Sequence, residues 1–155
     1  MMKIVIITIG QPRDRALRNM VSEYLKRCQP YLPIEIDYVP EGRRASSPEK
    51  VVERESEALL KKVKERDFLV LLDERGQHFT SREFSQWLYR HIEEVHGRLV
   101  FVIGGAYGLS DKIKKESGEL ISLSEMTFPH ELCLLFLSEQ LYRAIAIHEG
   151  MAYHH

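Results

Sequence analysis

Val102-Ile103-Gly104-Gly105-Ala106-Tyr107-Gly108 ends a short apolar run in glycines, and a helical pattern follows it. A second segment, Leu123-Ser124-Glu125-Met126-Thr127-Phe128-Pro129-His130, also lies between an apolar run and a helical pattern. Strands that end in this way leave main-chain N–H and C=O groups free at the carboxyl edge of a sheet, where open α/β sheets bind their ligands. Two such edges close together in the chain predict a main-chain pocket for a small, flat, polar ligand such as a nucleoside.

Strand and helix patterns alternate along the whole chain. Apolar, β-branched or alternating runs predict strands at 3–9, 34–39, 68–72, 99–103 and 120–123. Helical patterns cover 13–27, 48–63, 81–96, 111–117 and 130–149. This alternation predicts an α/β fold with a mainly parallel sheet and helices on both of its faces. The 155 residues fit one domain, 1–155, with one core.

Two of the predicted helices begin with capping signals. Ser47-Pro48-Glu49 combines an N-cap serine, a proline in the first turn and an acid near the positive helix end. Thr80 and Glu83 have the spacing of a capping box. Both signals fix where a helix starts, and therefore where the preceding loop ends.

The charge balance is nearly neutral, with a formal net charge of −1. It argues against a dedicated nucleic-acid coat protein, because phosphate binding needs a positive field. Basic side chains cluster locally, and we expect these clusters to be solvated surface. They are Arg13, Arg15 and Arg18, then Arg43 and Arg44, then Lys112, Lys114 and Lys115.

Nothing in the sequence indicates a membrane or an oxidising compartment. No apolar stretch approaches the roughly 20 residues of a membrane span, and residues 1–10 are better explained as a first strand than as a signal peptide. Cys28 and Cys133 show no metal or redox spacing. We therefore expect a reduced, cytoplasmic protein.

The last predicted helix contains a stretch without a polar face, Leu132-Cys133-Leu134-Leu135-Phe136-Leu137. A helix that is apolar all round must be buried on all sides, and a domain of this size has little interior. The stretch favours a homodimer in which the helix lies between the sheet and the partner. The alternative is a fully internal helix in a monomer.

The glycine segment does not match a nucleotide-binding motif. It reads Gly-Gly-x-x-Gly and follows the fourth predicted strand, which disfavours a dinucleotide oxidoreductase. Its glycines are equally compatible with a tight turn alone. The sequence also lacks a His-Glu-x-x-His motif, paired cysteines and a nucleophile elbow, so we expect neither a metal nor covalent catalysis.

Polar residues interrupt the apolar last helix at Glu139, Gln140 and Arg143. A guanidinium near a buried surface usually has an anionic or carbonyl partner. Two interpretations stay open at this point. Arg143 either contacts a substrate or forms a structural ion pair with Glu139, four residues earlier.

Several motifs together resemble one family over the full length of the chain. They include the strand that ends at Gly10, the Glu-Tyr-x-x-Arg pattern of residues 23–27, Phe101-Val102-Ile103-Gly104-Gly105 and Gly108-Leu109. They continue with Leu123-Ser124-x-Met126-Thr127-Phe128-Pro129-His130, Glu139-Gln140-x-Tyr142-Arg143-Ala144 and the terminal Tyr153-His154. This combination resembles the RlmH (YbeA) family of SPOUT-class RNA methyltransferases.

The resemblance implies a carboxyl-terminal trefoil knot, a rare exception to the rule that chains do not knot, and a homodimer. It also implies S-adenosylmethionine as the methyl donor. The reaction would be methylation of N3 of a pseudouridine in helix 69 of 23S ribosomal RNA, on the assembled ribosome. The family's cofactor positions correspond here to Leu72, Gly104, Leu123, Ser124, Glu125, Met126, Thr127 and Phe128.

Simple chemistry agrees with these expectations. Leu72, Leu123 and Met126 offer apolar surfaces for an adenine ring, and Gly104 has no Cβ to hinder a close approach. The sulfonium is reactive without a metal, so the protein mainly has to align the methyl group with N3. The weakly acidic N3 must lose its proton, which a base or a nearby cation would assist.

Three residues are the catalytic candidates. We expect Arg143 to orient the base or stabilise its anion, His154 to accept a proton and Tyr153 to shape the pocket. The terminal His155 departs from the family's end and leaves open whether it is native.

Two other functions remain as alternatives. One is a SPOUT methyltransferase that acts on another RNA such as a tRNA. The other is a ribosome-binding factor that has kept the fold without the reaction.

Overall fold

The computed structural model describes residues 3–42 and 46–155. The strands are β1 Ile4–Ile9, β2 Ile34–Val39, β3 Phe68–His78, β4 Leu99–Ile103 and β5 Glu119–Ser122. The helices are α1 Arg15–Cys28, α2 Pro48–Lys62, α3 Ser81–Glu94, α4 Asp111–Glu116 and α5 His130–His148. Most ends lie within two residues of the predicted ones. Arg43 and Arg44 lie outside the described residues.

The strands form one parallel sheet in the order β2-β1-β4-β3-β5. The predicted mainly parallel sheet is therefore confirmed, and every strand pair within it is parallel. Because the strands run in one direction, the segments that follow β3, β4 and β5 all leave from the same edge. The glycine segment and the Leu123–His130 segment follow two of these strands, so they meet at that carboxyl edge.

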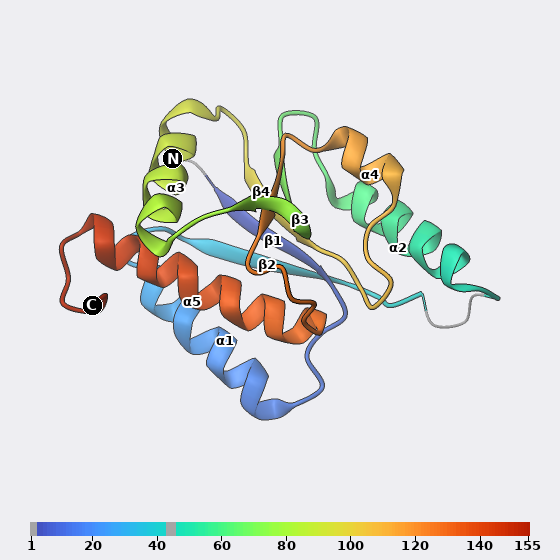
Figure 1. Ribbon diagram of the computed structural model, residues 1–155, viewed down its shortest axis with the longest axis horizontal. Helices are drawn as coiled ribbons and strands as arrows, with labels where there is room; N and C mark the ends of the chain where they lie inside the picture. Colours follow the sequence, from blue (N-terminus) through green and yellow to red (C-terminus); the bar gives the residue numbers. More distant parts are fainter. Residues whose placement is uncertain (1–2, 43–45) are drawn as a thin grey trace.

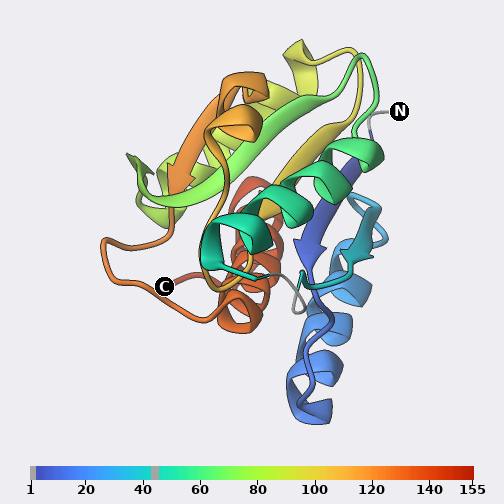
Figure 2. The ribbon, with the colours of Figure 1, turned by 90° about the vertical axis from the view of Figure 1, so that its right-hand side faces the viewer.

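Helices cover both faces of the sheet (Figures 1 and 2). The helices α1, α3 and α5 pack on one face, where α5 lies between the other two. The helices α2 and α4 pack on the opposite face. The strands β1 and β4 are buried on both faces, which explains why their sequences are apolar without alternation.

The strand β3 is longer than the sequence predicted. Its apolar first half ends at Leu72 as expected, but the strand continues through polar residues to His78. A register shift lets both Leu72 and Gln77 pair with Ile121 of β5. At Gly76 a Cβ would lie 2.6 Å from the backbone carbonyl carbon of Leu120, so only glycine allows the strand to cross β5 so closely.

Both predicted capping signals are confirmed. The Ser47 hydroxyl accepts a hydrogen bond from the Lys50 N–H at 3.3 Å at the start of α2. At the start of α3, Thr80 accepts from the Glu83 N–H and the Glu83 carboxylate accepts from the Thr80 N–H. These caps satisfy N–H groups that have no partner inside the helix.

The apolar helix α5 is mostly buried by its own chain, contrary to the expectation that one small domain could not cover it. Leu134, Leu135, Leu137 and Leu141 are buried because α1 and α3 flank the helix on both sides. The side chain of Phe136 remains 38% exposed. The uncovered apolar surface is therefore one strip of the helix rather than its whole circumference.

A buried ion pair connects the amino ends of β3 and β4. The Asp67 carboxylate accepts hydrogen bonds from Arg98 at 2.7 and 2.9 Å and from the Lys64 N–H at 2.7 Å. Burial raises the pKa of Asp67, but the bonds from Arg98 and Lys64 outweigh it, so the net shift is downward. The folded state therefore stabilises the charged form of the Asp67 carboxylate.

We expect Asp67→Asn to lower the free energy of unfolding by about 3 kcal/mol at pH 7, because it leaves Arg98 without its charged partner. Since the folded pKa is depressed, the pair's contribution is complete above about pH 4 and is lost as the pH falls further. Urea unfolding of both proteins at pH 7 and pH 3 tests this. The gap between them should narrow at pH 3; an equal gap at both pH values would contradict the prediction.

Candidate functional site

The carboxyl edge of the sheet contains a hollow of about 850 Å³, which we call the edge hollow. Its walls come from the end of the apolar part of β3, the glycine segment after β4 and the segment before α5. They comprise Leu72, Asp73, Glu74, Arg75, Ile103, Gly104, Gly105, Ala106, Tyr107, Gly108, Leu109, Lys114, Thr127, Phe128, Pro129, His130 and Cys133. The lining combines apolar side chains such as Leu72 and Phe128 with glycines and polar residues, which suits a flat ligand with polar edges such as a nucleoside.

The structure brings half of the expected cofactor residues to this hollow. Leu72, Gly104, Thr127 and Phe128 line it. The remaining expected residues lie elsewhere: Leu123 lines a neighbouring hollow, and Ser124, Glu125 and Met126 line neither.

Residues 124–126 form a turn that connects the two hollows. The Ser124 hydroxyl accepts a hydrogen bond from the Met126 N–H at 3.0 Å, and the Ser124 carbonyl accepts one from Ser122 at 2.8 Å. The Met126 side chain is 73% exposed. In the single chain it therefore does not form the apolar cover that the sequence suggested for the adenine ring.

The glycine segment is both a tight turn and a wall of the edge hollow. The Gly108 N–H donates to the Gly105 carbonyl at 3.1 Å, and Gly108 has a φ of 82°. A Cβ on Gly104 would lie 2.9 Å from the Leu109 side chain. Gly104 is thus required by packing within the turn, in addition to any approach of a ligand.

Charged groups that sequence reasoning missed line the same hollow. Asp73 pairs with Arg75 at 3.3 Å and with Lys114 at 3.4 Å. Burial raises the pKa of Asp73, but the bonds from Arg75 and Lys114 prevail and the net shift is downward. The expectation that Lys114 is a solvated surface lysine is therefore wrong, because it is partly buried and paired with Asp73. Lys112 and Lys115 are exposed as expected. Only the fold shows this, because the pairing joins β3 to α4.

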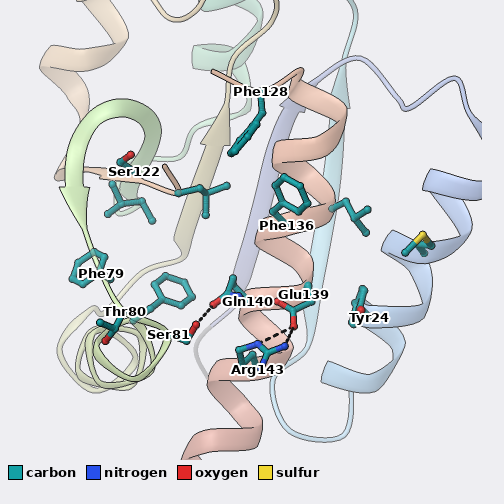
Figure 3. Close-up of a pocket in the computed structure, with 15 residues that line it drawn as sticks. Tyr24, Phe79, Thr80, Ser81, Ser122, Phe128, Phe136, Glu139, Gln140 and Arg143 are labelled. Carbon is teal, nitrogen blue, oxygen red and sulfur yellow. Dashed lines mark hydrogen bonds and ion pairs between the residues drawn. The ribbon is translucent and has the colours of Figure 1, made fainter. Parts of the chain in front are cut away.

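A second hollow of about 520 Å³, which we call the helix hollow, lies beside α5. Figure 3 shows Glu139 and Arg143 on α5, with Tyr24 of α1 on one side and Ser81 of α3 on the other. Its apolar lining includes Phe128, which also borders the edge hollow. The exposed side chains of Met20 and Phe136 line it as well.

The three expected catalytic residues lie together, and Arg143 among them lines the helix hollow. Arg143 donates to Glu139 at 2.9 Å and to His154 Nδ1 at 3.1 Å, and its guanidinium carbon lies 4.7 Å from the centre of the Tyr153 ring. Tyr153 donates to the same Glu139 oxygen at 3.0 Å. The ion pair with Glu139 therefore exists, and it holds Arg143 next to the carboxyl-terminal tail.

The hydrogen bonds constrain the proton chemistry of this cluster. Bonding to Glu139 raises the pKa of Arg143 further, so it is always a donor. His154 Nδ1 accepts from that guanidinium, and the free Nε2 of a neutral ring then carries the N–H. Nδ1 of His154 can accept a proton only after the hydrogen bond from Arg143 is broken. Burial and bonding to Tyr24 and Glu139 raise the pKa of Tyr153, which keeps that phenol neutral.

The catalytic candidates are far from the edge hollow within one chain. Cys133 is the residue of α5 in the lining of the edge hollow that is nearest to Arg143, which lies almost three turns farther along the same helix. At 1.5 Å per residue the helix advances about 15 Å between them. A methyl donor in the edge hollow would therefore be out of reach of Arg143 of the same chain.

Among residues 3–42 and 46–155, no group of three or more His, Cys, Asp or Glu side chains is placed to hold a metal ion. Within the same part of the chain, no helix has the length and apolar character needed to cross a membrane.

Similarity to known proteins agrees with this architecture. A family model described as "Predicted SPOUT methyltransferase" matches residues 2–154. The chain is 42% identical to ribosomal RNA large subunit methyltransferase H of Cytophaga hutchinsonii, over 99% of this chain and 100% of that protein. It is 41% identical to the protein of that name from Dictyoglomus thermophilum, with the same coverage.

A solved structure, a probable methyltransferase from Bordetella pertussis Tohama I, matches with a TM-score of 0.55. It is 15% identical and covers 93% of this chain and 95% of its own, so it supports the fold alone.

The parallel sheet, its main-chain hollow and these matches define the class as a SPOUT methyltransferase with the predicted carboxyl-terminal knot. Within that class, the chain belongs to the family of ribosomal RNA large subunit methyltransferase H. The resemblance drawn from the sequence motifs is thereby confirmed.

Proposed function

We propose that this protein uses S-adenosylmethionine to methylate N3 of a pseudouridine in helix 69 of 23S ribosomal RNA, in the assembled ribosome. The observation that carries the proposal is full-length identity of 42% to a protein named for methylating the large-subunit RNA, combined with a nucleoside-sized hollow at the carboxyl edge. We take residues 1–155 as one domain that works in the cytoplasm, where its substrate is.

We propose the edge hollow as the binding site for the adenosyl part of the cofactor. Leu72 and Phe128 offer apolar contacts to the adenine ring, and the main chain around Gly104 and Thr127 offers donors and acceptors to its polar edge. The loop 123–126 would close over the cofactor from outside. When bound, S-adenosylmethionine supplies an electrophilic methyl group, so the chain's own task is to orient the base and manage its proton.

We propose that a homodimer completes the active site. The distance of about 15 Å along α5 keeps Arg143 away from a methyl donor in the edge hollow of its own chain. A second copy packed on the strip around Phe136 and Met20 covers exposed apolar surface and continues the helix hollow. The cluster of Arg143, Tyr153 and His154 would then serve the partner's cofactor, with Arg143 stabilising the anion that forms at N3.

The near-neutral charge favours an assembled ribosome over bare RNA as the substrate. With a net charge of −1, the chain has no large positive field for binding phosphates. Shape recognition of a composite ribosomal surface by two subunits compensates for this.

The test is transfer of label from methyl-labelled S-adenosylmethionine to free 23S RNA, 50S subunits and 70S ribosomes from an unmethylated strain, followed by mapping of the label. We expect label in helix 69, chiefly in 70S ribosomes. Label in tRNA alone would favour the first alternative. Ribosome binding without cofactor binding would favour the non-catalytic factor.

A further inference from the structure

A third hollow of about 390 Å³, which we call the side hollow, adjoins the edge hollow. The two share part of their lining, namely Gly105, Ala106, Tyr107 and His130. The side hollow extends from there to the first turns of α2, including Ser47 and Glu55. A ligand whose main body lies in the edge hollow can therefore extend a short polar arm into the side hollow.

A buried carboxylate, that of Glu55, lies in the wall of the side hollow. Glu55 is only 4% exposed, and its Oε2 accepts a hydrogen bond from the Gly42 N–H at 3.0 Å. Its Oε1 is buried and has no hydrogen-bond partner among the described residues. A Cβ on Gly105 would lie 2.6 Å from that oxygen, so the carboxylate faces directly onto the glycine segment.

A second buried polar atom in the same hollow likewise has no hydrogen-bond partner in the part of the chain that the structure describes. It is Nε2 of His130, the first residue of α5. An imidazole nitrogen can donate a hydrogen bond, whereas an ionised carboxylate can only accept. Buried polar groups in native proteins are normally paired. One unpaired acceptor and one potential donor in the same hollow indicate a ligand with both a donor and an acceptor.

We propose that the side hollow binds the amino-acid end of S-adenosylmethionine, with Glu55 accepting from its α-ammonium group and His130 donating to its carboxylate. This inference rests on the proposed function, which supplies a cofactor whose nucleoside ends in a zwitterion. The adenosyl part occupies the edge hollow, and the tail turns past Gly105 into the side hollow. Glu55 and His130 are thus binding residues that fix the direction of the tail.

The electrostatics of Glu55 agree with a cationic partner. Burial raises the pKa of Glu55, and the nearby Glu41 acts in the same direction. The Gly42 N–H and His130 oppose this, but the net shift is upward. The described residues thus compensate the ionised carboxylate only in part. An ammonium group next to Oε1 supplies the rest, and the bond becomes charge-assisted.

Three ligands that share the adenosine moiety separate the tail from the rest. S-adenosylhomocysteine has the whole tail, S-adenosyl-3-thiopropylamine keeps the amine without the carboxylate, and 5′-methylthioadenosine has neither. Binding of each is measured by calorimetry on the full chain. The variants are Glu55→Gln, which retains an acceptor for Gly42, and His130→Phe, which keeps a ring without the donor. Glu57→Gln, an exposed residue of α2, is the matched control.

We expect Glu55→Gln to raise the Kd of both amine-bearing ligands at least tenfold and that of methylthioadenosine less than twofold. His130→Phe should weaken only S-adenosylhomocysteine, and Glu57→Gln none. Equal losses for all three ligands, or no loss, overturn the inference. A wild-type chain that binds none of them overturns the proposed function instead. If one variant fails to fold, the other still decides between these outcomes.

Discussion

Replacement of Arg143 by alanine should lower the rate of methyl transfer about 10²- to 10³-fold, the range found when one donor to a developing anion is removed. The affinity for S-adenosylhomocysteine should stay within twofold of wild type, because Arg143 lies outside the edge hollow. Arg143→Lys should recover little activity. A lysine keeps the charge but lacks the planar guanidinium that donates to Glu139 and to His154 at the same time.

The measurement is single-turnover transfer of label to unmethylated 70S ribosomes, together with calorimetry for the cofactor product. Arg90→Ala is the control, since Arg90 is an exposed arginine on the neighbouring helix α3 and its loss changes the net charge equally. Thermal unfolding of each variant reports whether the fold persists. A rate near wild type for a folded Arg143→Ala protein would remove this residue from the mechanism.

Local sequence patterns were sufficient for most of the fold. The buried strands β1 and β4 have uninterrupted apolar sequences, and the caps at Ser47 and Thr80 set the helix starts. Each of these features depends on neighbours within a few residues, so the chain itself carries the information. The parallel arrangement followed from the alternation of strands and helices.

Contacts between distant segments were harder to predict. The second half of β3 is polar and contains Gly76, a pattern that predicts the end of a strand. The strand nevertheless continues, because its last residues pair with β5, which lies far along the chain. The burial of α5 was likewise underestimated, because the flanking positions of α1 and α3 are set by the strand order rather than by the sequence of α5 itself.

In the candidate site, too, local motifs were predictable from the sequence and contacts between distant segments were not. The motifs identified the segments that line the edge hollow and the cluster around Arg143, since each is short and chemically distinctive. Glu55 escaped notice because it sits in an ordinary charged helix sequence. Its burial arises only where α2 meets the glycine segment, so no local pattern could have marked it.

Two inactive variants should regain activity when they are combined in one dimer. Thr127→Trp places a large ring at an exposed position on the wall of the edge hollow and should abolish cofactor binding. Arg143→Ala should lower the rate at least a hundredfold but leave cofactor binding intact. If each site takes its cofactor from one subunit and its Arg143 from the other, a mixed dimer has one site with both parts intact.

The mixed dimer is isolated by coexpressing the two variants with different tags and purifying through both. We expect each pure variant to be near background and the mixed dimer to reach about half of the wild-type rate per dimer, because a symmetric dimer has two equivalent sites. Activity that stays at background in a folded mixed dimer would mean that each chain uses its own Arg143. Since about 15 Å of α5 separates Arg143 from Cys133 on the wall of the edge hollow, the cofactor and the substrate base would then have to span that distance within one chain.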